Sequence, residues 1–367
     1  MPLVDDSMDE STPWLVAQLQ QRFVPTTTGL IVDQQVSAAP VWCTTLPAFE
    51  RWFSEIESEL DQTLGRRLAH AAAESEEWIL DQLPPMPSSW FGQQKKRIST
   101  INSDWSLRGL GQLAMLESST SSATLLVANR SHTALASGMG NAAWEGIQEK
   151  RFRFQWSDRG AGETVVELSG DPRTIPKPSD TVLLWLDVKG EATQSECLYD
   201  RARHEADGVW TVEGNRAMML HRDLLLRFET LSLPYLASTP RSSDARTEWN
   251  GITGSDQIVL WDAMAEAARK QFLASGELVL IASPEHWISV SKRHLTLHGL
   301  GTVSNSSEID SNGGVELLIP STIHPAILVG RLIGCWERAE GRAARATWSN
   351  DADGHHIKLE SRREIAE

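Results

Sequence analysis

The sequence predicts an α+β fold made of two duplicated domains that pack against each other as a pseudo-dimer. Residues 123–157 and 315–349 align without a gap, and upstream WSLRGLG (residues 105–111) matches LTLHGLG (residues 295–301). Each copy has the pattern of a strand, a helix and a β-hairpin, and helical patterns precede it. That order is typical of helices packed on an antiparallel sheet. A repeat of this length indicates a duplicated domain and not a solenoid unit.

The aligned segments share ten identities, including two tryptophan pairs at the same spacing. They are Leu125/Leu317, Leu126/Leu318, His132/His324, Ala134/Ala326, Gly138/Gly330, Trp144/Trp336, Glu145/Glu337, Arg153/Arg345, Trp156/Trp348 and Ser157/Ser349. We expect an N-terminal extension over residues 1–27, a first repeat domain over 28–170, a connection over 171–207 and a second repeat domain over 208–367. These two domains are called the first half and the second half below.

The first half divides into elements by its periodicity. Leu46–Leu60 has apolar residues at helical spacing and Pro47 in the first turn, so it predicts an amphipathic helix. Alternating residues in Lys150–Ser157 predict a strand with one buried face. The remaining expected elements are helices over Pro13–Phe23, Leu64–Leu80 and His132–Gln148, the last with Ser131 as its cap, and strands over Ile98–Ile101, Trp105–Leu116, Ala123–Ala128 and Thr164–Leu168.

The connection contains three prolines in Asp171–Asp180, which predicts a linker, and then an apolar run at Thr181–Lys189, which predicts a strand. Leu224–Phe228 predicts a helix at the start of the second half. The order of the first half then recurs over Gln257–Leu273, Glu277–Ala282, Trp287–Leu297, Val315–Ile319, Pro325–Arg338 and Ala343–Ser349.

Composition limits the partners that we expect. The net charge of −15 disfavours nucleic acid and anionic membranes. No apolar run approaches the roughly 18 residues that a membrane-spanning helix needs. The acidic N-terminus lacks the order of a signal peptide, so we expect a cytoplasmic protein. Three dispersed cysteines, Cys43, Cys197 and Cys335, provide neither a disulfide framework nor a metal knuckle.

The strand, helix and hairpin order resembles the C-terminal half of the 4-vinyl-reductase domain, which shares its fold with subunits of the TRAPP tethering complex. The resemblance rests on Leu125–Ser157 with Gly162–Leu168, and on Leu317–Ser349 with Gly354–Leu359. It implies a dimeric module that binds or senses small apolar or aromatic ligands. Family members often carry cysteines in the last hairpin, and this chain has none there, so no metal or thiol chemistry is implied.

Several motifs resemble sites that carry out chemistry. Gly138–Ala143 matches a dinucleotide fingerprint, but it lies inside the expected helix and not at its start, so we expect no nucleotide. The shared Gly138 and Gly330 are expected to let the helix pack closely on the sheet. The matched Glu145 and Arg153 predict an ion pair that joins helix to strand, as do Glu337 and Arg345. His355-His356 lacks a third metal ligand, so we expect no metal and no cofactor.

The leading hypothesis is a non-enzymatic protein that binds or senses a small apolar ligand. Its candidate binding residues are the matched histidines and tryptophans of the two halves: His132, Trp144, Trp156, His324, Trp336 and Trp348. The structural alternative is that the histidines are partly exposed residues at helix starts and that the tryptophans belong to the hydrophobic core. The alternatives are an assembly scaffold that contacts other proteins and an enzyme on an unrecognised scaffold. Because Phe152 and Phe154 match Ala344 and Ala346, a cavity is expected in the second half.

Overall fold

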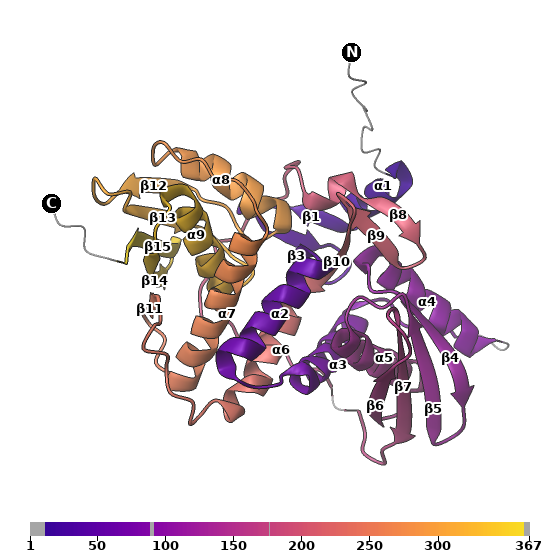
Figure 1. Ribbon diagram of the computed structural model, residues 1–367. Coiled ribbons are helices and arrows are strands. Elements are labelled where there is room, and N and C mark those ends of the chain that lie inside the picture. Colours follow the sequence, from indigo (N-terminus) through magenta and orange to yellow (C-terminus); the bar gives the residue numbers. More distant parts are fainter. Residues whose placement is uncertain (1–11, 89–91, 176, 363–367) are drawn as a thin grey trace.

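A computed structural model describes residues 12–88, 92–175 and 177–362 (Figure 1). It confirms the mixed α+β class and the antiparallel sheets, with a single parallel pair among the described strands. It contains no helix long and apolar enough to cross a membrane within these residues. The expectation of disorder at residues 1–11 lies outside the described residues.

A six-stranded sheet lies at the centre of the molecule and takes strands from both halves. Its order is β1-β2-β3-β10-β9-β8, and all neighbours are antiparallel. The strands are β1 (Phe23–Pro25), β2 (Ile31–Asp33), β3 (Ala39–Thr45), β8 (Arg203–Ala206), β9 (Val209–Val212) and β10 (Asn215–His221). The two middle strands, β3 and β10, come from different halves, so the halves share one continuous sheet.

Four long helices pack between the central sheet and the outer sheets. They are α2 (Leu46–Leu60), α3 (Gly65–Gln82), α6 (Arg222–Ser232) and α7 (Ser255–Ala274). Helix α2 packs on α7, and α3 packs on α6, so both contacts join one half to the other (Figure 1). The indole N–H of Trp52 on α2 donates to the carbonyl of Met264 on α7 at 3.2 Å. One continuous apolar core therefore runs through both halves.

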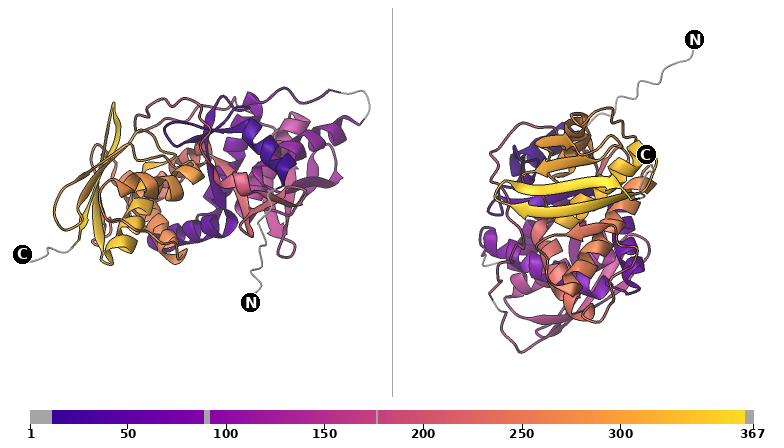
Figure 2. Two further views of the ribbon diagram at one scale, coloured as in Figure 1. Left: turned by 90° about the horizontal axis from the view of Figure 1, so that it is seen from above. Right: turned by 90° about the vertical axis from the view of Figure 1, so that its left-hand side faces the viewer.

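Each half also has an outer sheet with its own covering helices, and Figure 2 shows these sheets at opposite ends of the molecule. The first half supplies β4 (Gln112–Ser118), β5 (Ser122–Ala128), β6 (Phe152–Asp158) and β7 (Glu163–Gly170), with α4 (Gln93–Arg108) and α5 (Thr133–Gln148). The second half supplies β11 (Thr247–Trp249), β12 (Asn305–Glu308), β13 (Val315–Ile319), β14 (Ala344–Asp351) and β15 (Gly354–Ser361), with α8 (His286–His294) and α9 (Pro325–Glu340). The remaining elements are α1 (Pro13–Arg22) and the short 3-10 helices η1 (Leu198–Arg201), η2 (Leu233–Tyr235) and η3 (Thr296–His298).

The matched glycines hold helix against helix, and not helix against sheet as the sequence suggested. A Cβ on Gly138 of α5 would lie 1.8 Å from the carbonyl oxygen of Ala69 on α3. A Cβ on Gly330 of α9 would lie 2.0 Å from the carbonyl oxygen of Ala265 on α7. Only glycine allows backbones to approach this closely, so each glycine fixes the same helix crossing in its half.

The strand predictions between residues 98 and 116 are wrong for most of that segment. Helix α4 covers it as far as Arg108, and β4 begins at Gln112. The buried face of α4 consists of Arg97, Ile101, Trp105 and Arg108, which recur at helical spacing. Two arginines on that face hide the apolar periodicity. Arg108 is buried because Glu76 and Asp104 pair with it, each at 2.9 Å.

Three further strand predictions are wrong, and the first of them, Glu277–Ala282, contains no strand. Trp287–Leu297 is matched to the α4 segment and is also mainly helical, in α8 and the start of η3. The segment Thr181–Lys189 contains no strand. Side-chain contacts hold it instead: Asn350 accepts from the Leu186 N–H at 2.7 Å and donates to the Leu186 carbonyl at 3.0 Å. Its Trp185 is buried in the second half.

Candidate functional site

His324, one of the predicted binding residues, is fully buried at the start of α9. Its Nδ1 accepts from the N–H of Ala326 at 3.2 Å, which caps the helix. Its Nε2 therefore donates to the carboxylate of Glu229 on α6 at 2.8 Å. Glu229 also accepts from Gln257 at 2.5 Å and from the indole of Trp261 at 3.1 Å. His324 is a satisfied structural residue in a polar network within the core.

His132 is the N-cap of α5, at the position matched to His324, but no carboxylate of the described residues takes the place of Glu229 beside its ring. It is half-buried between the rings of Phe49 and Phe53, each 5.6 Å away in an edge-on arrangement. Its Nδ1 is buried without a hydrogen-bond partner among the described residues. Burial, followed by the nearby Arg130, lowers the pKa of His132 to about 4. The imidazole is therefore neutral at pH 7.

The four predicted tryptophans differ in their surroundings. Trp144 and Trp336 are each 1% exposed, and Trp336 donates to the Gly313 carbonyl at 2.8 Å. Trp348 is buried between Trp249 and Trp261, with ring centres 5.9 and 5.5 Å away. Trp156, which is matched to Trp348, is only half-buried and stacks on Phe154 at 5.8 Å.

The predicted residues therefore do not form one site. His324 and Trp348 share a neighbour, because both rings contact the indole of Trp261. Among the described residues no ring contact joins His132 to Trp156, or either of them to the second-half group. In the second half the aromatic side chains pack together around Trp261.

The matched glutamates connect helix to strand, but not through the predicted arginines. Glu145 accepts from the backbone N–H of Phe152 at 2.6 Å, and Glu337 accepts from that of Ala344 at 2.9 Å. Each carboxylate thus holds the first residue of the strand that follows its helix. This backbone contact explains why both halves carry a glutamate at the position.

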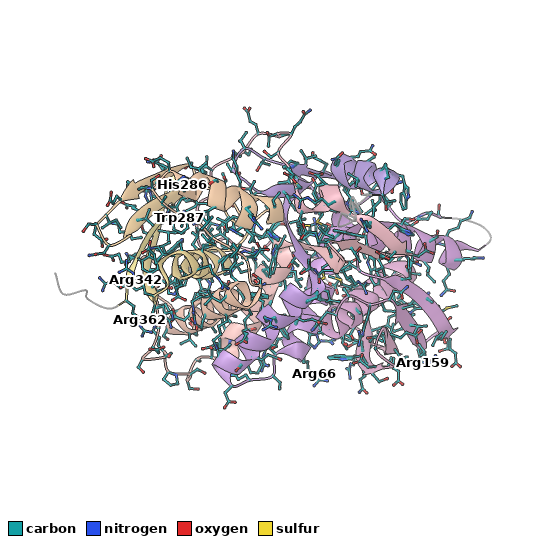
Figure 3. All side chains as sticks on the ribbon, turned by 45° about the horizontal axis from the view of Figure 1, so that its top comes forward. Arg66, Arg159, His286, Trp287, Arg342 and Arg362 are labelled. Atoms are coloured by element: carbon teal, nitrogen blue, oxygen red, sulfur yellow. The ribbon has the colours of Figure 1, made fainter. Side chains whose placement is uncertain are left out.

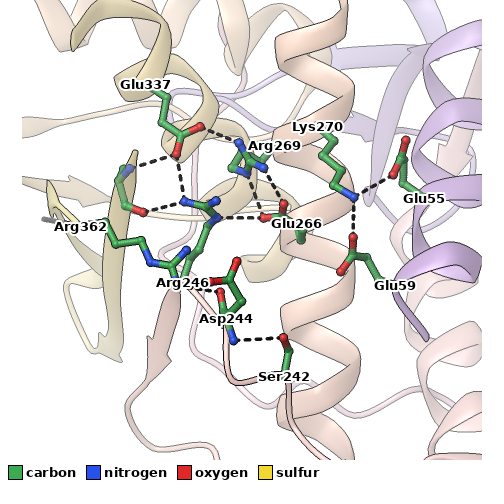
Figure 4. A network of polar contacts seen from close by, with 11 residues as sticks. Glu55, Glu59, Ser242, Asp244, Arg246, Glu266, Arg269, Lys270, Glu337 and Arg362 are labelled. Atoms are coloured by element: carbon green, nitrogen blue, oxygen red, sulfur yellow. Dashed lines mark hydrogen bonds and ion pairs between the residues drawn. The ribbon is translucent and has the colours of Figure 1, made fainter. Parts of the chain in front are cut away.

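The arginines that were expected to pair with these glutamates pair elsewhere. Arg153 contacts Asp171 at 3.0 Å, and Arg345 contacts Glu360 at 3.5 Å. Both arginines lie on strands with their side chains largely exposed, away from the helix. The actual partners of Glu337 are Arg269 at 2.6 Å and Arg246 at 3.3 Å, as Figure 4 shows.

The most distinctive polar group of the molecule is Arg331, in the middle of α9. It lines a cleft of about 980 Å³ between the central sheet and the second half. Arg331 is 8% exposed, and no carboxylate among the described residues pairs with it. Its contacts are the Nε2 of His298 at 3.3 Å, the amide oxygen of Gln271 at 3.5 Å and the ring of Phe272 at 5.7 Å. Its Nε has no described partner.

Burial dominates the electrostatics of Arg331, although Glu277 of the same cleft lies near enough to raise its pKa. Burial lowers its pKa, and it lowers the pKa values of its histidine neighbours in turn. The pKa of His298 falls to about 3 and that of His294 to about 4, in each case through burial and then Arg331. His298 donates from Nδ1 to the Cys43 carbonyl at 3.1 Å, so its neutral Nε2 is free to accept from Arg331.

Other cations of the cleft are also unpaired. Arg51 and Lys292 line it, are exposed and have no carboxylate partner in the described part of the chain. Its glutamates are already in ion pairs: Glu277 with Arg293 at 3.1 Å, and Glu196 and Glu213 with Arg201 at 2.7 and 2.8 Å. The cleft therefore has a local excess of positive charge in a chain whose net charge is −15.

Sequence reasoning passed over Arg331, although a signal was present. The residue interrupts the run ILVGRLIGC (residues 327–335), which is apolar on every side of the helix. A charge in a helix that is apolar all round is buried and needs a partner. The matched residue of the first half is Met139, so the charge is specific to the second half.

The expected absences concern metals and thiols. No group of three potential metal ligands occurs among residues 12–88, 92–175 and 177–362. The three cysteines are separate and buried, and burial raises the pKa values of their thiols.

Comparisons with known proteins do not assign this chain. It matches no family model, no curated protein and no solved structure.

Proposed function

We propose that this protein is a non-enzymatic small-molecule-binding protein whose ligand carries a carboxylate or a phosphate. The observation that carries the proposal is Arg331, a buried guanidinium that faces a large cleft without a carboxylate partner. Burying a charge is costly unless it is paired. An anionic ligand would supply the missing partner, and a planar guanidinium suits the two oxygens of such a group.

The neutral histidines beside Arg331 fit the same proposal. With His298 already accepting from the guanidinium, its imidazole adds no charge that would compete with an anion. Arg51 and Lys292 near the surface of the cleft would attract the ligand from solution. This proposal keeps the small-molecule function predicted from sequence, but replaces an apolar ligand by an anionic one.

The architecture that we propose for this function is a tandem duplication folded as a pseudo-dimer. The arrangement of the central sheet supports it. Cys43 of β3 and Met219 of β10 pair with each other, and each lies two residues before the N-cap of the helix that follows, Thr45 or His221. Matched residues that face each other across an antiparallel pair are expected at a two-fold axis.

Two reciprocal contacts support the same arrangement. The Gly111 N–H donates to the Gly208 carbonyl, and the Gly301 N–H donates to the Gly29 carbonyl, both at 3.1 Å. In each case the last glycine of the matched GLG motif in one half bonds to a glycine near the beginning of the other half, in a turn between two strands of the central sheet. The 4-vinyl-reductase-like ancestry of each half stays a proposal, which the strand, helix and hairpin order of both halves supports.

The experiment is anion binding to the full chain, measured by isothermal calorimetry with inorganic phosphate and with benzoate. The test variant is Arg331→Met, which places the first-half residue Met139 at the matched second-half position. It should lose binding of whichever anion the wild type binds. Arg342→Met removes an arginine outside the cleft and should leave binding unchanged.

A second readout uses stability in the absence of ligand. Removing an uncompensated buried charge should leave Arg331→Met as stable as the wild type or about 1–2 kcal/mol more stable. Binding that survives Arg331→Met, or no binding of either anion, would contradict the proposal. Catalytic turnover of a bound anion would support the enzyme alternative instead.

A further inference from the structure

The two outer sheets differ at one edge, and this difference points to a second kind of binding. In the second half, β14 is covered by β11, which runs parallel to it. In the first half the matched strand β6 is the last of its sheet, in the order β4-β5-β7-β6. The second half has a long connection between α6 and α7 that supplies β11. The connection between α2 and α3 spans only residues 61–64 and supplies no strand.

The backbone groups along β6 are arranged to accept another strand. The N–H of Asp171 donates to the Arg151 carbonyl, and the Arg159 N–H donates to the Glu163 carbonyl, both at 2.9 Å. Odd-numbered residues of β6 therefore bond to β7, and the N–H and carbonyl groups of Phe154 and Trp156 face outward. No bond to another segment occupies these groups in the described part of the chain.

The same groups are used in the second half, which supplies a template. The Ala346 N–H donates to the Arg246 carbonyl at 2.8 Å, and the Asn250 N–H donates to the Trp348 carbonyl at 2.9 Å. Ala346 and Trp348 are the matched residues of Phe154 and Trp156. An unpaired strand edge of this kind is a ready template for another strand.

The aromatic side chains are buried at the covered edge of the second half and partly exposed at the open edge of the first half. In the second half, Trp249 of β11 packs on Trp348 and Trp261, and all three are buried. In the first half, Trp156 and Phe154 are only half-buried and are stacked on each other. An aromatic side chain on an added strand would cover them as Trp249 covers Trp348.

The charges identify what kind of segment fits. In the second half, two acids of α7 form ion pairs with the segment that contains β11. Asp262 pairs with Arg241 at 2.6 Å, and Glu266 pairs with Arg246 at 3.4 Å. The match between α3 and α7 places Arg66 at the position of Asp262 and His70 at that of Glu266. This alignment of α3 with α7 is set by Ala69 and Ala265, whose carbonyl oxygens lie against the matched glycines Gly138 and Gly330. Arg66 reverses the charge of Asp262, and His70, whose pKa is lowered by burial and then by Arg66, removes the negative charge of Glu266. A segment that fits the first half is therefore acidic opposite Arg66.

A cleft of about 680 Å³ accompanies the β6 edge, between α3 and the sheet. Four arginines line it, together with both phenylalanines of β6. The arginines are Arg66, Arg151, Arg153 and Arg173. Arg66 is exposed and has no ion-pair partner among the described residues, and Figure 3 shows its side chain projecting from the surface. Arg151 already pairs with Glu77 and Glu145, and Arg153 and Arg173 pair with Asp171. Charge complementarity therefore favours an acidic group opposite Arg66.

We infer that the β6 edge binds an extended acidic segment of another protein, parallel to β6, with an aromatic side chain over Trp156. The inference does not depend on the anion cleft, which shares no lining residue with the cleft at β6. A second copy of this chain fits less well. A two-fold axis would pair β6 antiparallel to its own copy, whereas β11, the template in the second half, runs parallel to its partner β14.

The probe is a fluorescently labelled peptide that copies residues 241–250 of this chain with R241E and R246E. It keeps the aromatic residue and the register of β11 and makes the segment acidic. Fluorescence anisotropy with the full chain should show saturable binding that weakens with added salt. The unchanged copy of residues 241–250, which retains both arginines, should bind more weakly by about fivefold or more.

The variants separate the β6 edge from general charge attraction. Arg66→Glu should weaken binding of the acidic peptide by about fivefold or more. Arg159→Glu is the matched control, because Arg159 is an exposed arginine of the same hairpin outside the cleft (Figure 3). It should bind as the wild type does. Hydrogen exchange should slow at the Phe154 and Trp156 amides when the peptide is bound.

Several outcomes would overturn the inference. They are no binding, equal loss in both arginine variants, or binding without protection of the two amides. Binding only after deletion of residues 1–11 would mean that the chain's own N-terminus occupies the edge. A dimer in sedimentation that Arg153→Glu changes, with no peptide binding, would assign the edge to a second copy.

Discussion

The matched histidines of the two halves have opposite surroundings. His324 donates to Glu229 and caps α9, whereas His132 lies between two phenylalanines and has a buried nitrogen without a described partner. Glu229 lies as far along α6 from the N-cap His221 as Phe53 lies along α2 from the N-cap Thr45. The residue at this position of the neighbouring helix, Glu229 or Phe53, therefore distinguishes a matched imidazole in a polar network from one between apolar rings.

Identical residues at matched positions of the two halves, such as His132 and His324, therefore need not share a role. Where the first half has apolar contacts around His132, the second half has a network that joins Glu229, Gln257, Trp261 and His324. The first half has its buried network elsewhere, where Arg108 bonds to Glu76 and Asp104. The position matched to Arg108 is His298, the neighbour of Arg331. The buried polar groups thus differ between the two halves, while the helix crossings at the matched glycines are alike.

The largest expected effect comes from removing the acid of the second-half network. Glu229→Leu should lower the free energy of unfolding by about 3–5 kcal/mol, because three buried donors lose their acceptor. Phe53→Leu, the same new residue at the matched position, should cost only about 1 kcal/mol. Urea denaturation at neutral pH measures both. Equal losses would show that Glu229 is no more than a space-filling side chain.

The matched tryptophans should differ in the same direction. Trp348→Ala should cost about 3–5 kcal/mol, because a ring buried against Trp249 and Trp261 is lost. Trp156→Ala should cost about 1–2 kcal/mol, since that ring already contacts solvent. Chemical denaturation of the two variants provides the comparison. A larger loss at Trp156 would mean that its half of the molecule depends on a buried ring there.

Acid should destabilise the protein through His132. Its pKa is about 4 in the folded chain, and an unfolded histidine titrates near about 6.5. Between these values the unfolded state binds a proton that the folded state does not, so stability is lost as pH falls. The loss should approach about 3 kcal/mol.

The variant His132→Phe isolates this contribution, because a phenyl ring fits beside Phe49 and Phe53 and does not titrate. The wild type should lose stability relative to the variant as the pH falls from about 7 to about 4. Denaturation curves over that range measure the difference. A constant difference between the two proteins would exclude His132 as the titrating group.

The smallest effects test what the halves have in common. Gly138→Ala and Gly330→Ala should each cost about 2 kcal/mol, because the new methyl group would meet a backbone carbonyl. Gly140→Ala is the control in the same helix, since its nearest neighbour is a side-chain methyl group at 3.6 Å. It should gain about 0.5–1 kcal/mol from helix propensity. Unequal costs at Gly138 and Gly330 would mean that the two helix crossings are not equivalent.

Periodicity was enough for elements with a continuous apolar face. Helix α2 has the predicted bounds, because its buried side chains are all apolar and recur at helical spacing. Helix α4 was read as strands because Arg97 and Arg108 belong to its buried face. The apolar segment around Trp185 predicts a strand, but it forms none, and side-chain hydrogen bonds from Asn350 hold it in place.

The sequence by itself determined the α+β class, the position of the two matched units and the short list of shared residues. Those features depend on local propensity and on spacing along the chain, which a single sequence records. Only the tertiary structure decided which shared residues are satisfied, which edge strand is covered and where Arg331 lies without an acid. These depend on side chains from distant segments, such as Glu229 beside His324, and burial makes the presence or absence of each partner decisive.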